Sequence, residues 1–173
     1  MVEVIKVYKQ ATPDMKFIGK KYLESDRKDG GFGYKWCEWF QNNWFEVLEE
    51  NVTESWKSQL EDSDAYVGMM RWKEGEEFQY WIGMLLPLET AVPEGYESVN
   101  FAAGNIGVGW LKGMEDEIYC KEDKCADKLV ENGMNIISGK ENAYWFFERY
   151  GCPRFTTPDE EGKIVLDICH FVE

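Results

Sequence analysis

The sequence IGKKYL at residues 18–23 has a near copy, IGVGWL, at residues 106–111. Both stretches follow the pattern Ile-Gly-x-x-aromatic-Leu, and they begin 88 positions apart. A strand-like stretch precedes each one, at residues 2–8 and 97–103. A six-residue match can arise by chance, but the shared order of elements favours a duplication.

Each half is expected to hold one long helix and several strands. The first helix is predicted over residues 36–50, where apolar side chains share one face and most polar ones the other. The second is predicted over residues 115–131, and Gly133 is expected to stop it. The remaining strands are predicted at residues 15–23, 64–72, 77–86, 144–150 and 163–172.

These elements predict an α+β fold made of two pseudo-symmetric βαββ halves. The halves are expected to share one continuous antiparallel sheet, with helices on one side and a central cleft, where ligands usually bind. We interpret residues 1–173 as a single domain. Its half-repeats span about 1–86 and 97–173, and residues 87–96, which contain two prolines, form the linker.

The composition restricts the classes of partner. Aromatic residues make up 16% of the chain, which exceeds the needs of an ordinary core and hints at a ligand cavity, although an aromatic-rich core explains it equally well. The formal net charge of −14 argues against binding to nucleic acid or to an anionic membrane surface, because both need clustered Lys and Arg. It is compatible with cationic ligands.

The five cysteines are dispersed, and His170 is the only histidine, so no zinc site of usual spacing can be assembled. We therefore expect reduced thiols, no metal and no cofactor. No signal-peptide pattern opens the chain, and no apolar run is long enough to span a bilayer, so we expect a cytoplasmic protein. The glycines at residues 30–33 lack the framing of a phosphate-binding loop.

The strand predicted at residues 144–150, YWFFERY, contains the main candidate for a functional residue. Strand alternation places Phe146, Glu148 and Tyr150 on one face, and Trp145, Phe147 and Arg149 on the other. A carboxylate among aromatic rings is costly to bury unless it is paired. Either this face is exposed to solvent, or Glu148 meets a cation, a hydroxyl or a ligand. The plainer alternative is a glutamate on an edge strand that pairs with a nearby Lys or Arg.

Several segments resemble GyrI-like domains, which drug-responsive AraC-type regulators share with DNA gyrase inhibitory proteins. The second half has the Glu-x-Tyr pattern at residues 148–150, an acidic turn at 158–162 and a final apolar strand at 164–168. The first half matches at residues 17–19, and residues 80–84 with 92–96 match the centre of the domain. Two departures are the absence of a helix-turn-helix segment before the first strand and an atypical ending at residues 169–171. We therefore expect a stand-alone effector-binding domain that is not by itself a transcription factor.

The resemblance implies that Glu148 lies in a central pocket and faces aromatic or cationic small molecules. Trp39, which falls among the polar residues of its predicted helix, is expected in the pocket wall. The further candidate ligand contacts are Tyr150, Phe146, Trp72, Tyr80, Trp110 and Trp145, and we expect at least two of Trp72, Tyr80, Trp110 and Trp145 to line the pocket.

Two other functions remain open. Some stand-alone proteins of this fold hydrolyse cyclopropane-containing, DNA-alkylating natural products, and this resemblance implies Glu148 as base and Tyr150 as hydrogen-bond donor. A gyrase-type protein inhibitor would instead use an acidic surface that mimics DNA. The acidic residues here are scattered along the chain, so we rank that function third.

Overall fold

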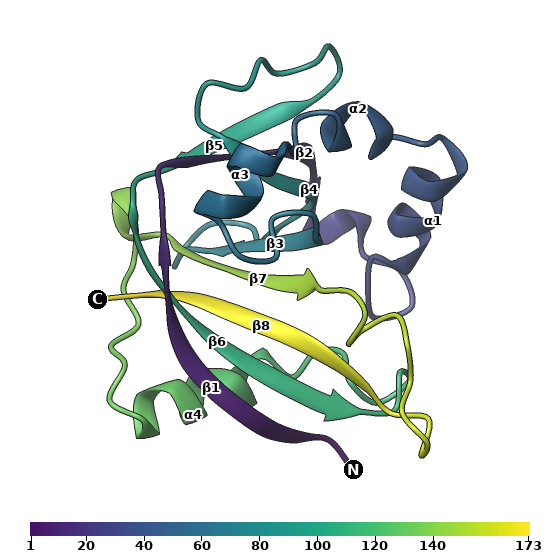
Figure 1. Ribbon diagram of the computed structural model, residues 1–173, viewed down its shortest axis with the longest axis vertical. Helices are drawn as coiled ribbons and strands as arrows, with labels where there is room; N and C mark the ends of the chain where they lie inside the picture. Colours follow the sequence, from purple (N-terminus) through teal and green to yellow (C-terminus); the bar gives the residue numbers. More distant parts are fainter.

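The computed structural model describes residues 1–173 and has one antiparallel sheet of eight strands at its centre (Figure 1). The order across the sheet is β1-β6-β8-β7-β3-β4-β2-β5. The strands are β1 (Glu3–Thr12), β2 (Met15–Leu23), β3 (Tyr66–Trp72), β4 (Gln79–Pro87), β5 (Glu97–Phe101), β6 (Gly104–Gly113), β7 (Tyr144–Tyr150) and β8 (Ile164–Val172). The predicted α+β class and continuous antiparallel sheet are confirmed. None of the helices has the length and apolar character needed to cross a membrane.

The connectivity of the two halves is the same. Exchanging β1–β4 with β5–β8 and reading the sheet from its other edge returns the same strand order. The repeated hexapeptides lie on the corresponding strands β2 and β6, but Ile18 and Ile106 belong to clusters on opposite faces of the sheet. A duplication would place the two hexapeptides at equivalent positions on their strands. That expectation is wrong in register, because a shift of one residue reverses the face of a strand.

One face of the sheet, here called the inner face, is closed by its own curvature and by helix α3 (Glu54–Gln59). Phe101 on the edge strand β5 stacks on Phe171 of β8 with ring centroids 4.9 Å apart, although these strands are not neighbours. Trp56 of α3 fills this interior, and its indole N–H donates to the carbonyl of Leu85 at 3.1 Å. The inner face is therefore packed core.

The opposite face, here called the outer face, carries α1 (Gly33–Gln41), α2 (Glu46–Glu49) and α4 (Glu122–Glu131). Beneath α4, an added Cβ at Gly109 would lie 2.9 Å from the sulfur of Cys125, so the glycine allows the helix to approach β6 closely. The expectation of helices on one side holds for α1, α2 and α4, whereas α3 lies on the inner face.

Both predicted long helices are shorter in the structure. The helix expected over residues 36–50 ends at Gln41, because Asn43 adopts a left-handed conformation with φ of 53°. The chain then turns and forms the separate α2. The helix expected over residues 115–131 begins only at Glu122, and the preceding residues form turns that end at Cys120 with φ of 60°.

Candidate functional site

A cavity of about 770 Å³ opens on the outer face, where β3 of the first half pairs with β7 of the second. Ten of its 20 lining residues are aromatic. The aromatic lining residues are Phe32, Trp36, Phe40, Tyr66, Phe78, Tyr80, Tyr119, Phe146, Tyr150 and Phe155. Ligand cavities of this size and lining accommodate drug-sized molecules.

The side chains of β7 alternate between this cavity and the inner face. Phe146, Glu148 and Tyr150 line the cavity, whereas Phe147 lies in the inner core and Arg149 pairs with Asp167. This is the predicted alternation. β7 lies between β3 and β8, and Glu148 forms no ion pair with any Lys or Arg. The alternative of an edge-strand glutamate in a surface salt bridge is therefore wrong.

Both oxygens of the Glu148 carboxylate accept hydrogen bonds from tyrosines. The Tyr80 hydroxyl donates to Oε1 at 2.7 Å, and the Tyr150 hydroxyl donates to Oε2 at 3.0 Å. The indole N–H of Trp36 donates to the Tyr80 hydroxyl at 3.0 Å. Since Glu148 is only 6% exposed, these hydroxyls replace the water that a carboxylate needs.

Burial raises the pKa of Glu148 to about 7, although the hydrogen bonds from Tyr80 and Tyr150 act in the opposite direction. The charge of Glu122 raises this pKa further. Burial and the neighbouring Glu148 also hold the pKa of both tyrosines well above its usual range, so their hydroxyls remain donors. The carboxyl group therefore changes charge near neutral pH: its ionised form can attract a cation or accept a proton, and its protonated form can donate one.

The rest of the cavity adds negative charge. Glu115 in the turn after β6 lines it, together with Glu122 and Asp123 at the start of α4. The only basic lining residue is Arg27, and its guanidinium already pairs with Glu24 at 2.7 Å. A cation that enters the cavity therefore meets aromatic faces and an excess of carboxylates.

Gly68 makes the contact between Tyr80 and Glu148 possible. It lies on β3 between Ile82 of β4 and Glu148 of β7 in the sheet register. A Cβ at this position would lie 2.4 Å from the Tyr80 hydroxyl oxygen and 2.7 Å from Oε1 of Glu148. Only glycine leaves room for these side chains to meet above the strand.

The substitution Gly68→Ala tests this requirement. The added methyl group should separate Tyr80 from Glu148 and reduce the free energy of unfolding by about 1–3 kcal/mol, the usual cost of overpacking. Urea unfolding measures this loss. The matched control is Gly33→Ala at the start of α1, where an added Cβ meets nothing within 4 Å and alanine favours the helix. Equal stabilities of the two variants would contradict the interpretation.

The structure brings together four of the eight candidate site residues: Glu148, Tyr150, Phe146 and Tyr80. Trp39 is fully buried on the inward side of α1 and donates its indole N–H to the Tyr22 hydroxyl at 3.0 Å. It borders only a smaller neighbouring hollow. Trp110 and Trp145 lie on the inner face, and Trp72 is 48% exposed at the end of β3, outside the cavity lining. One residue of the set Trp72, Tyr80, Trp110 and Trp145 therefore lines the cavity, rather than at least two.

Sequence reasoning missed much of the cavity wall. Trp36 is the first residue of the helix predicted over residues 36–50, and only the structure places its indole against Tyr150, with ring centroids 4.9 Å apart. Tyr66 and Tyr119 come from the start of a strand and from a turn, where no periodic pattern marks them. All five cysteines are free thiols, and Cys120 and Cys152 line the cavity.

No protein-family model matches this sequence, and no curated protein matches it. Solved structures share its fold. A protein of Staphylococcus aureus MU50 described as a bacterial transcription regulation protein is 14% identical, with a TM-score of 0.60 over 97% of this chain and 98% of that chain. The protein SAV2435, solved bound to tetraphenylphosphonium, is 15% identical, with a TM-score of 0.54 over 98% of this chain and 94% of that chain.

A third similar structure is described as a hydrolase from Listeria innocua. It is 11% identical, with a TM-score of 0.53 over 99% of this chain and 93% of that chain. These identities are low, so the likeness establishes a shared fold and not a shared activity.

Proposed function

We propose that this chain is a GyrI-like effector-binding domain that binds aromatic or cationic small molecules in the cavity above β3 and β7. The observation that carries the proposal is the buried Glu148 carboxylate at the wall of an aromatic cavity that holds no free cation. The shared fold with SAV2435, which binds tetraphenylphosphonium, supports this choice.

The residues would bind a cation in two ways. The ionised Glu148 attracts it through a medium from which water is largely excluded, where electrostatic attraction is strong. The aromatic rings of the lining, among them Trp36, Tyr80 and Phe146, would supply cation–π contacts and a large apolar area. The volume of about 770 Å³ suits a ligand with several rings.

A thermal-shift screen tests the proposal, because a ligand that binds only the folded state raises the unfolding temperature. We expect tetraphenylphosphonium and cationic dyes to raise it in proportion to the logarithm of their concentration, and inorganic cations of equal charge to have no such effect. If no organic cation or hydrophobic drug shifts the midpoint at any concentration up to the solubility limit, the binding function is wrong.

A hydrolase is the second candidate, favoured by the pKa of Glu148 near 7 and by the likeness to the hydrolase from Listeria innocua. In this reaction Glu148 would take a proton from water while the water oxygen bonds to a cyclopropane carbon. The carbon–carbon bond of the ring would break, and its electron pair would move into the conjugated carbonyl of the substrate. Tyr150 would position the carboxylate through its hydrogen bond.

Turnover distinguishes the two candidates. Incubation with a cyclopropane-containing alkylating compound would give a ring-opened product faster than in buffer alone, as measured by mass spectrometry, only if the chain is an enzyme. Loss of that product in Glu148→Gln would assign the base. Binding without turnover would leave the chain as a sequestering or delivery protein. The third candidate, inhibition of a protein target through an acidic surface, makes no use of this cavity.

A further inference from the structure

Residues 151–157, which follow β7 and are here called the wall segment, contribute to both faces of the sheet. Cys152, Phe155 and Thr156 of this segment line the cavity on the outer face. The ring of Phe155 packs edge-on against Tyr150 with centroids 4.7 Å apart, and Tyr150 donates to Glu148. The position of this segment therefore determines one side of the cavity.

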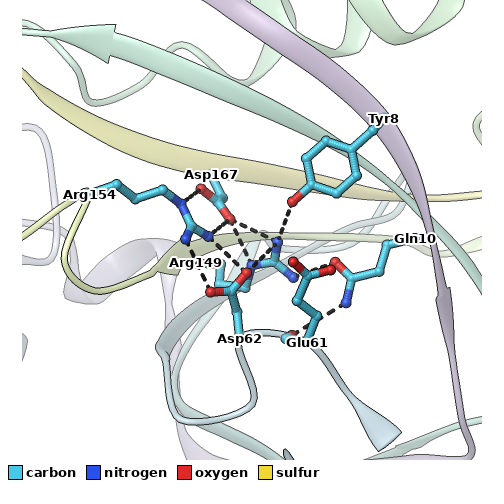
Figure 2. A network of polar contacts seen from close by, with 7 residues as sticks. All are labelled: Tyr8, Gln10, Glu61, Asp62, Arg149, Arg154 and Asp167. Carbon is cyan, nitrogen blue, oxygen red and sulfur yellow. Dashed lines mark hydrogen bonds and ion pairs between the residues drawn. The ribbon is translucent and has the colours of Figure 1, made fainter. Parts of the chain in front are cut away.

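Arg154 extends from the same segment to a buried cluster of charges (Figure 2). Its guanidinium lies between two carboxylates: Nε donates to Asp167 Oδ1 at 2.8 Å, and the two terminal nitrogens donate to Asp62 at 3.1 and 2.9 Å. Asp167 on β8 is fully buried. Planar contacts of this kind are stronger and more directional than those of a lysine.

The remaining surroundings of Arg154 leave it little freedom. Its guanidinium lies 4.9 Å from the ring of Trp110. An added Cβ at Gly151 would lie 2.5 Å from the Arg154 guanidinium, so glycine is needed for the side chain to fold back over its own loop. The amide of Phe155 donates to the carbonyl of Gly151 at 2.9 Å, and that of Thr157 to Pro153 at 2.8 Å, which makes the segment a compact turn.

The charge cluster also joins parts of the chain that are far apart in sequence. Asp62 lies in the turn between α3 and β3, and the guanidinium of Arg149 on β7 contacts both Asp62 and Asp167, at 3.3 and 2.8 Å. Arg149 also donates to Gln10 of β1 at 2.9 Å. Figure 2 shows these side chains converging from β1, β7 and β8, from the turn between α3 and β3, and from the wall segment.

We propose that Arg154 is a positioning residue for the ligand cavity, and that its ion pairs with Asp62 and Asp167 hold the wall segment, and with it Phe155, against the bound molecule. The part that concerns ligands rests on the proposed binding function, whereas the part that concerns the segment does not. Arg154 itself lines no part of the cavity, so it acts through Phe155 and Tyr150.

Hydrogen–deuterium exchange of Arg154→Met tests the first part without any ligand. The amides of Phe155 and Thr157 should exchange at least about tenfold faster than in the wild type, because charge-assisted hydrogen bonds hold their turn closed. Amides of β3 and β4 should be unchanged. Arg154→Lys keeps the positive charge but lacks the planar guanidinium that can donate to two carboxylates at once. Its exchange rates should be intermediate.

The matched control is Arg71→Met. Arg71 is another buried arginine, pairs with Glu76 at 2.6 Å, and lies outside the cavity lining. Its loss should lower stability without accelerating exchange in the wall segment. Equal exchange of Phe155 and Thr157 in the wild type and Arg154→Met, or the same acceleration in Arg71→Met, would overturn the proposal.

Calorimetry with two cations tests the second part. Tetraphenylphosphonium is large enough to reach Phe155, and its affinity should fall about three- to tenfold in Arg154→Met, while that of tetramethylammonium should change less than about twofold. Equal losses for both cations, or none for either, would show that Arg154 does not shape the cavity. If the wild type binds neither cation, the binding function fails, and the exchange rates still decide whether Arg154 holds the segment.

Discussion

Glu148→Gln is expected to weaken the binding of methyltriphenylphosphonium by on the order of 1–3 kcal/mol, which is about 5- to 150-fold in the dissociation constant. The substitution keeps the shape of the side chain and removes its charge. Calorimetric titration at a pH of about 8, where most of the wild-type carboxyl group is ionised, measures the difference.

Triphenylphosphine oxide is the matched control ligand, because it is close in shape to methyltriphenylphosphonium and carries no net charge. Its affinity should be nearly the same in the wild type and in Glu148→Gln. If the cation binds both proteins equally well, Glu148 plays no part in recognition. If the neutral molecule loses as much affinity as the cation, the substitution has changed the shape of the cavity rather than its charge.

The second large effect is a pH dependence of stability that belongs to Glu148. Its pKa is about 7 in the folded protein against an ordinary value of 4.5, so the folded state favours the protonated form. A group whose pKa is raised on folding contributes its full stabilisation at pH values below its ordinary pKa. This contribution is lost as the pH rises through its pKa in the folded state. The wild type should therefore lose about 3 kcal/mol of unfolding free energy relative to Glu148→Gln between a pH of about 4.5 and a pH above 7.

Urea unfolding of both proteins across this pH range gives the difference directly, because the titration of other groups largely cancels. The difference should level off once Glu148 is fully ionised. A bound phosphonium should reverse part of the loss, since it stabilises the ionised form. If the unfolding free energies of the two proteins change in parallel with pH, the pKa of Glu148 is not raised by folding.

Strands could be predicted from this sequence because their alternation is a local property. The predictions for β2 and β7 match the structure at both ends, since each is a short segment rich in aromatic and apolar residues that is bounded by turn residues. The helices were less predictable. Two asparagines at residues 42–43 interrupt the helical pattern, and the left-handed conformation of Asn43 ends α1.

The cavity was only half predictable, for physical reasons that differ between residues. Trp145 is adjacent to Phe146 on a strand, so the same alternation that placed Phe146 beside Glu148 excludes Trp145 from that face. Trp39 stands on the polar side of an isolated helix, yet Phe45 and Tyr96 cover it from other parts of the chain. The role of Gly68 depends on a contact between neighbouring strands, which no single segment of sequence contains.

Glu148 and Arg149 are consecutive on β7 but serve opposite faces of the sheet, one in the cavity and the other among the aspartates of the inner face. A slip of β7 by one residue would exchange them, so that a guanidinium would enter the aromatic cavity and a carboxylate would face Asp62 and Asp167. Like charges would then be buried together on the inner face, at a cost of several kcal/mol. The neighbouring pair of opposite charges thus favours one register of β7: only the alignment that pairs Arg149 with Asp62 and Asp167 also places Glu148 in the cavity.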